Sequence, residues 1–122
     1  MGLSILLVED DPRLQALGRK VLERQGYQVT LAGDGEQAVT ATATGTFDLV
    51  LMDLSMPKMD GHQATRLIKA RTPQLPIVAV TAHAMASDRE RCIESGFDTF
   101  LAKPYQIPDL LAVVESFAPR PV

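Results

Sequence analysis

Five polar residues whose side chains could react together each follow a short apolar run of the chain: Glu9, Asp10, Asp53, Thr81 and Lys103. Three of the side chains are carboxylates, one is a hydroxyl and one is an amine. Two carboxylates about 4 Å apart repel each other by roughly 4 kcal/mol at an effective dielectric near 20. Such a cluster requires either protonation or a hard dication, and oxygen ligands with room for water suit Mg²⁺.

This set of groups predicts phosphoryl chemistry on one of the carboxylates. A carboxylate beside a metal ion and a lysine can attack phosphorus, which makes Asp53 the candidate nucleophile and an acyl phosphate its product. Mg²⁺, Lys103 and the Thr81 hydroxyl would then stabilise the charge on the equatorial oxygens during transfer. Each polar group therefore has a chemical role.

The elements that must position these groups are alternating strands and helices. Residues 3–8, 49–52 and 77–80 are mostly apolar, as central strands covered on both faces should be, whereas residues 28–32 alternate and residues 99–102 are short. We therefore predict an α/β fold of five βα units, a flavodoxin-like doubly wound sandwich of three layers. Its parallel sheet has the strand order 2-1-3-4-5, and ligands bind at the carboxyl ends of such strands.

Helical periodicity predicts which residues of the helices are buried. The first helix has a stripe of residues with i, i+3, i+4 spacing that is predicted to face the core: Leu14, Leu17, Gly18, Val21 and Leu22. Leu67 and Ile68 are expected to anchor a central helix, and the last helix has a similar stripe: Ile107, Leu110, Leu111 and Val114.

Helix ends are also predicted. Gly26 is expected to end the first helix in a left-handed conformation, and Gly45 and Gly96 to end two others. Asp11 could be a fourth acid of the site, but with Pro12 behind it the simpler interpretation is the N-cap of the first helix.

Composition limits the possible functions. The 122 residues are predicted to form one domain, and the net charge of -3 gives no reason to expect binding to nucleic acid or membrane by this domain. Cys92 is the only cysteine, the chain opens with no signal-peptide pattern, and the apolar runs are only of strand length. We therefore expect a soluble, cytoplasmic chain. His62 and His83 lack partners with ligand spacing and are predicted to lie on the surface.

The ordered motifs resemble one known family. These motifs are Glu9-Asp10, Asp53 with Met56-Pro57 and Asp60-Gly61, Thr81-Ala82, and Lys103-Pro104. Together they resemble the receiver domain of two-component signalling systems over nearly the whole chain. The resemblance implies that Mg²⁺ (or Mn²⁺) is ligated by Asp10, Asp53 and the backbone carbonyl of Ser55, with Glu9 acting partly through water. It also implies a cis Lys103-Pro104 bond, Lys103 paired with phosphoryl oxygens, and tuning of hydrolysis by Ser55 and His83.

The resemblance further implies a phosphohistidine donor on a histidine kinase or phosphotransfer domain, and a two-state switch through Thr81 and Phe100. The fourth helix, fifth strand and fifth helix, around Met85, Phe100 and Tyr105, would respond and could form a dimer. Phe100 departs from the tyrosine that the family often has, so ring packing alone would carry the switch.

The sequence is compatible with more than one parent protein. Residues 81–92, 96–98 and 101–104 resemble receivers of hybrid sensor kinases, whose receivers lie on the cytoplasmic side of a membrane-bound chain; a free-standing single-domain regulator is the alternative. We expect no enzymatic activity beyond the domain's own phosphorylation and dephosphorylation. A phosphatase of small esters would need a cap insertion that is absent here, and a flavin carrier would suffer from the acidic loop after the first strand.

Overall fold

The computed structural model describes residues 3–54, 61–81, 90, 93–103 and 105–117. Five parallel strands form one sheet in the order β2-β1-β3-β4-β5, as predicted. The strands are β1 (Ser4–Val8), β2 (Gln28–Ala32), β3 (Leu49–Asp53), β4 (Ile77–Thr81) and β5 (Thr99–Ala102). Their carboxyl ends therefore lie along one edge of the sheet, where the predicted site residues begin.

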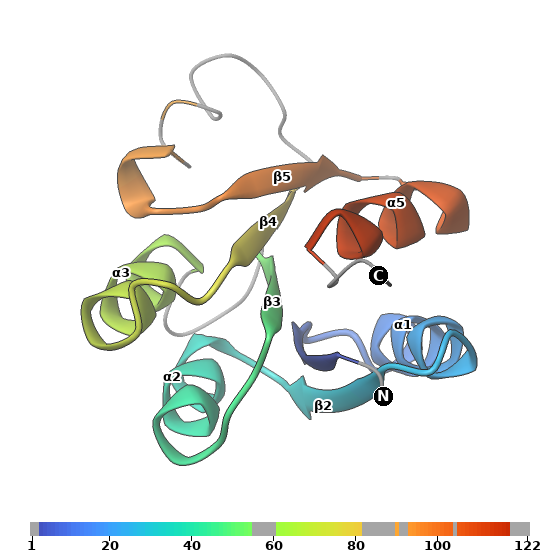
Figure 1. Cartoon of the computed structure of the whole chain (residues 1–122), viewed down its shortest axis with the longest axis horizontal. Coiled ribbons are helices and arrows are strands. Elements are labelled where there is room, and N and C mark those ends of the chain that lie inside the picture. Colours follow the sequence, from blue (N-terminus) through green and yellow to red (C-terminus); the bar gives the residue numbers. More distant parts are fainter. Residues whose placement is uncertain (1–2, 55–60, 82–89, 91–92, 104, 118–122) are drawn as a thin grey trace, which may run out of the picture.

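Helices cover both faces of this sheet (Figure 1). The helices are α1 (Pro12–Arg24), α2 (Gly35–Thr44), α3 (Gly61–Arg71) and α5 (Ile107–Phe117). Two apolar clusters fill the spaces between the three layers. One joins the sheet to α2 and α3 through Ala38, Ala64 and Ile68, and the other joins it to α1 and α5 through Leu22, Leu110 and Val114.

The strand order explains how far each strand is buried. Every residue of β3 and β4 is buried, because these strands have a neighbour on each side and helices on both faces. The second strand alternates exposed and buried positions, and β5 is only partly buried, as edge strands should be. The predicted edges and centre of the sheet are therefore confirmed.

The predicted helix ends are also confirmed. Asp11 is the N-cap of α1, where its side chain accepts a hydrogen bond from the backbone N–H of Arg13, and a proline occupies the first helical position. Gly26 follows the helix with φ of 91°, and Gly96 has φ of 102°, a region that favours glycine. Gly45 ends α2 in an extended conformation. Asp11 therefore acts as the N-cap of α1, the simpler of its two interpretations.

Four predicted core positions are wrong. The exposed fractions of Leu14 and Leu17 are 38% and 51%, and Leu67 and Ile107 are also exposed. The stripe of α1 that faces the sheet is narrower than the sequence period indicates: Gly18 and Leu22 are its buried residues, and Gly18 packs directly on β1. A Cβ at Gly18 would lie 2.8 Å from Leu7 Cδ2. Leu14, one turn before Gly18, and Leu17, directly before it, are exposed rather than in the core.

The predicted fourth helix falls mostly outside the described residues, of which Glu90 and residues 93–95 are helical. Within the described part of the chain, no helix has the length and apolarity needed to cross a bilayer.

Candidate metal centre

Three acidic residues meet at the carboxyl ends of β1 and β3, as predicted. Asp53 is the last residue of β3, and Glu9 and Asp10 directly follow β1. One carboxylate oxygen from each lies within 4.8 Å of the others. Glu9 and Asp53 are buried, with exposed fractions of 6% and 2%, whereas Asp10 is exposed. The cluster therefore opens to solvent on the side of Asp10.

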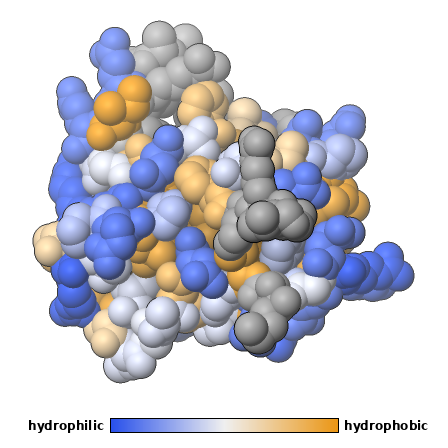
Figure 2. Space-filling model, viewed as in Figure 1, coloured by the Kyte–Doolittle hydropathy of each residue, from blue (hydrophilic) through white to orange (hydrophobic). Residues whose placement is uncertain are grey.

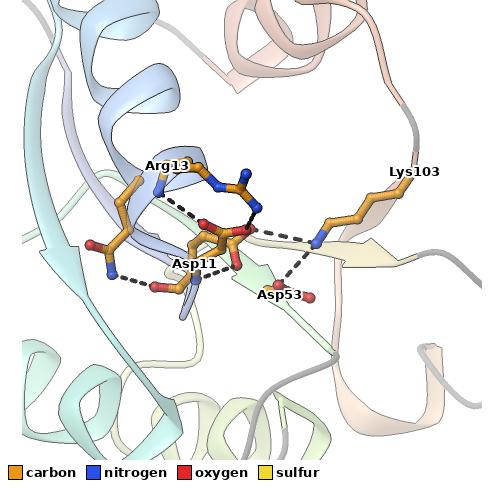
Figure 3. A network of polar contacts seen from close by, with 6 residues as sticks. Asp11, Arg13, Asp53 and Lys103 are labelled. Carbon is orange, nitrogen blue, oxygen red and sulfur yellow. Dashed lines mark hydrogen bonds and ion pairs between the residues drawn. The ribbon is translucent and has the colours of Figure 1, made fainter.

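Lys103 completes this cluster from the end of β5. Its Nζ lies 2.9 Å from Asp53 Oδ2 and 3.5 Å from Glu9 Oε1. Figure 3 shows the lysine side chain reaching across to Asp53. The backbone N–H of Lys103 donates to the carbonyl of Thr81 at 2.7 Å, so β4 and β5 fix where this side chain begins.

The electrostatics of the cluster are most visible at Glu9. The pKa of Glu9 is raised from 4.5 to about 7, first by burial and then by the hydrogen bond with Asp53 and the charge of that residue, against the lowering effects of the Asp11 N–H and of the charge of Lys103. Glu9 is therefore partly protonated near neutral pH when no cation is present. One proton and one lysine partly compensate the negative charge of the site.

Two neighbouring groups respond to the same charges. Burial lowers the pKa of Lys103, but the hydrogen bond and charge of Asp53, together with Glu9, outweigh burial and hold that pKa above its ordinary value. Lys103 is thus a permanent cation. Burial, with the negative charge of Glu9, also raises the pKa of Tyr105, which therefore stays neutral at physiological pH.

The loop after β1 is held by short-range hydrogen bonds. The N–H of Asp11 donates to Glu9 Oε2 at 3.2 Å. Its own side chain accepts from the Arg13 N–H at 2.9 Å, a bond that keeps the pKa of Asp11 below its ordinary value. Figure 3 shows Asp11 and Arg13 beside the site rather than inside it.

The structure also brings Gln15, which the sequence interpretation missed, to this loop. Its side-chain amide donates to the backbone carbonyl of Glu9. The sequence spacing could have indicated this contact. Gln15 comes four positions after the N-cap Asp11, so it lies one helical turn from the cap, on the side of the acidic loop.

The remaining predicted residues are placed only in part. Thr81 is the buried last residue of β4, and Phe100 is a half-buried residue of β5 that packs against the cluster shared with α2 and α3. Ser55, His83, Met85 and Pro104 lie outside the described residues. The expected backbone ligand, the cis bond and the residues beside Thr81 are therefore not placed.

The prediction that His62 lies on the surface is wrong. His62 is only 8% exposed. Its Nδ1 lies 2.7 Å from Ser95 Oγ, and its ring meets that of Phe97 edge to face, with centroids 5.6 Å apart. A partner 33 positions away in the sequence gives no local pattern, so spacing along one helix could not reveal it. His62 joins α3 to the segment before β5.

This arrangement fits a hard dication. All three acidic side chains offer oxygen atoms, one of them faces solvent, and no sulfur or imidazole ligand belongs to the described cluster. Carboxylates with open coordination positions for water are the ligands that Mg²⁺ prefers. The buried carboxylate of Asp53 can attack an electrophilic centre. Lys103 can then compensate the negative charge that the added group brings.

Comparison with known proteins agrees with the fold and the cluster. The family model described as response regulator receiver domain matches residues 5–115. The sensor protein GacS of Pseudomonas syringae pv. syringae is 44% identical over 115 residues, which are 90% of this chain and 13% of GacS. The sensor histidine kinase RcsC of Salmonella typhi is 38% identical over 118 residues, which are 97% of this chain and 12% of RcsC. The chain therefore spans a small part of these relatives.

Solved structures give the same result. The receiver domain of the sensor histidine kinase PA1611 from Pseudomonas aeruginosa PAO1, crystallised with a magnesium ion in its active-site cleft, is 40% identical. Its TM-score is 0.88, with 96% of this chain and 98% of that chain covered. The chemotaxis protein CheY4 of Vibrio cholerae, at 23% identity and a TM-score of 0.91 over 96% and 99% of the two chains, shares the fold. The chain belongs to the response regulator receiver domain family of two-component systems.

Proposed function

We propose that Asp53 accepts a phosphoryl group from a phosphohistidine in a reaction that requires Mg²⁺. The carrying observation is the contact of 2.9 Å between Lys103 Nζ and Asp53 Oδ2, inside a cluster of three carboxylates at the strand ends. The P–N bond of the donor breaks, a P–O bond to an Asp53 carboxylate oxygen forms, and the imidazole leaves with the bonding electron pair. The whole chain, residues 1–122, forms this single phosphoacceptor domain.

Each residue of the site has a proposed role in this transfer. Asp10, Asp53 and the Ser55 carbonyl would hold Mg²⁺, with Glu9 acting partly through water, and the ion supplies positive charge to the phosphoryl oxygens. Lys103 moves its ion pair from the carboxylate of Asp53 to the transferred group, which keeps the buried charge compensated. The hydroxyl of Thr81 would bind another phosphoryl oxygen, and Phe100 would follow it in the switch.

The test is phosphorylation by a small donor. Wild type incubated with acetyl phosphate and Mg²⁺ should gain one phosphoryl group by intact-mass spectrometry, and Asp53→Asn should gain none. Asp48→Asn is the matched control, because Asp48 directly precedes the same strand at its opposite end. Equal labelling of wild type and Asp53→Asn would falsify the assignment of Asp53 as the phosphoacceptor. Labelling that persists in EDTA would show that the reaction does not require Mg²⁺.

A groove beside the site supports a helical protein as the donor. The groove has a volume of about 350 Å³, and Lys103 lies in its wall. Its apolar lining comes from both sides of the site: Leu14, Leu17, Val21, Tyr105, Ile107 and Leu110. The outer surface over α1 is hydrophilic in Figure 2 and has four exposed basic residues: Arg13, Arg19, Lys20 and Arg24. A histidine kinase or phosphotransfer domain fits this surface if it presents a pair of helices with apolar side chains for the groove and acidic side chains for the basic residues of α1.

The docking proposal is tested separately from the chemistry. Leu17→Glu should slow transfer from a phosphorylated histidine phosphotransfer domain at least about tenfold, since it places a charge in an apolar contact, while leaving labelling by acetyl phosphate unchanged. Leu67→Glu, an equally exposed leucine on α3, is the matched control. Equal donor rates for Leu17→Glu and Leu67→Glu would move the docking surface elsewhere.

The parent protein is proposed from the relatives. Sensor kinases lead the curated matches, which supports a receiver attached to a hybrid sensor kinase and located on its cytoplasmic side. A free-standing single-domain regulator is the second candidate, and the length of the native gene separates the two. We further propose that the face of the fourth helix, β5 and α5 is the responding surface and the dimer contact. Sedimentation of the phosphorylated and unphosphorylated domain tests the dimer.

A further inference from the structure

Gln15 connects helix α1 to the acidic loop. Its side-chain amide nitrogen donates to the backbone carbonyl of Glu9, six positions earlier. The helix holds the side chain in place, because the N–H of Gln15 donates to the carbonyl of the N-cap residue Asp11 at 2.9 Å. Gln15 is half-buried, so this bond is sheltered from solvent on one side.

The bond acts on a peptide group that connects two acids of the site. The carbonyl of Glu9 and the N–H of Asp10 belong to the same planar unit. The N–H of Glu9 is already held by the carbonyl of Ala32 at 3.0 Å, at the end of the neighbouring strand. With the Glu9 carbonyl also held, the peptide plane cannot rotate freely. The peptide group that leads into Asp10 is thereby held, which limits the directions that the Asp10 side chain can take.

We propose that Gln15 is a positioning residue of the metal site, which keeps the carboxylates of Glu9, Asp10 and Asp53 convergent on one cation. The inference rests on the proposed Mg²⁺-dependent function. Without this bond, the described hydrogen bonds of the loop would be those from the Glu9 N–H to the Ala32 carbonyl and from the Asp11 N–H to the Glu9 carboxylate, and neither holds the peptide group between Glu9 and Asp10. The exposed acid, Asp10, has no other described restraint on its orientation near the strand end.

A purely structural role is the alternative, and the chain contains a matched example of one. Gln37, near the start of α2, accepts a hydrogen bond at its Oε1 from the N–H of Gly33 at 2.7 Å. It ties the loop after β2 to the following helix, as Gln15 ties the loop after β1. No residue of the acidic cluster belongs to that loop. Removing the two amides should therefore affect stability alike and metal binding differently.

The experiment compares Gln15→Met, Gln15→Asn and Gln37→Met with wild type. Methionine keeps the length and helix propensity but removes the donor, and asparagine keeps the amide but is one methylene too short to reach the carbonyl. The Mg²⁺ dissociation constant is measured by isothermal titration calorimetry, and the urea midpoint is measured in EDTA. Both Gln15 variants should raise the Mg²⁺ dissociation constant about 10-fold to 100-fold, the usual effect of losing an outer hydrogen bond to a metal ligand. Gln37→Met should leave it within about two-fold.

Two results would overturn the inference: an unchanged Mg²⁺ dissociation constant in Gln15→Met, or an equal weakening in Gln37→Met. A fall of the urea midpoint alone, without weaker metal binding, would leave Gln15 with a structural role and count against the inference as well. Wild type that neither binds Mg²⁺ nor accepts phosphoryl from acetyl phosphate would instead refute the proposed function. The two failures are therefore distinguishable.

Discussion

Replacing Glu9 by glutamine should stabilise the metal-free protein at alkaline pH. The pKa of Glu9 is about 7 in the folded protein and 4.5 in its ordinary state. A carboxyl group whose pKa is raised by folding contributes stability that is complete below about 4.5 and is lost as the pH rises through about 7. Glutamine has no proton to lose, so Glu9→Gln escapes this loss.

The size of the effect follows from the same interval. Between 4.5 and about 7, at roughly 1.4 kcal/mol per pH unit, the loss amounts to about 3 kcal/mol. For a domain of this length, that corresponds to about 10 °C in the melting temperature. Thermal melts in EDTA should therefore show Glu9→Gln and wild type close together near pH 5 and separated by several degrees near pH 8, with the variant higher. Saturating Mg²⁺ should remove or reverse the separation, because the ion stabilises the ionised carboxylates.

The control is Glu115→Gln, which changes an exposed carboxylate on α5. It should follow wild type at every pH. Melting temperatures of Glu9→Gln that run parallel to those of wild type from about pH 5 to pH 8 would show that Glu9 is not buried beside Asp53, and the charge balance derived for the site would be wrong.

Three further predictions test the surroundings of the site. Lys103→Met should lower the free energy of unfolding, measured by urea titration in EDTA near pH 8, by about 1–3 kcal/mol, because buried Asp53 loses its hydrogen-bonded cationic partner. A urea titration that matches wild type would contradict the ion pair. Gly61→Ala should destabilise by about 1–3 kcal/mol in the same titration and slow labelling by acetyl phosphate, because the new Cβ would lie 3.0 Å from the Asp53 carbonyl. Asp98→Ala should cost about 1–3 kcal/mol by urea denaturation, since Asp98 Oδ2 accepts from both Lys69 and the Ile77 N–H; a loss below about 0.5 kcal/mol would show that water replaces it.

The sheet and the acidic cluster could be predicted from the sequence because both depend on local patterns. Continuous apolar runs identify central parallel strands, and the residue after each such run must lie at one edge of the sheet. The end of β3 therefore located Asp53, and the end of β1 located Glu9, without any knowledge of side-chain contacts. The N-cap Asp11 and the terminator Gly26 were equally local, since each satisfies the backbone of its own helix.

The failures depend on contacts between distant segments. The period of 3.6 residues placed Leu14 and Leu17 on the apolar face of α1. It could not distinguish a position in the core from a position in a groove at the protein surface. His62 is buried beside Ser95, a residue that follows β4 in the sequence, and no spacing within α3 reveals this contact. The raised pKa of Glu9 likewise arises from burial and from Asp53, which only the assembled fold brings together.

The position of β5 at the sheet edge has a consequence for local unfolding. Among the described strands it pairs only with β4, and just one of its four residues is buried. Segments with few buried apolar contacts open at a small fraction of the global free energy, and they exchange their amide hydrogens fastest. Because Lys103 directly follows this strand, such an opening would carry the lysine away from Asp53 while the other strands stay intact. Hydrogen exchange along β5 would then report the state of the site more sensitively than global melting does.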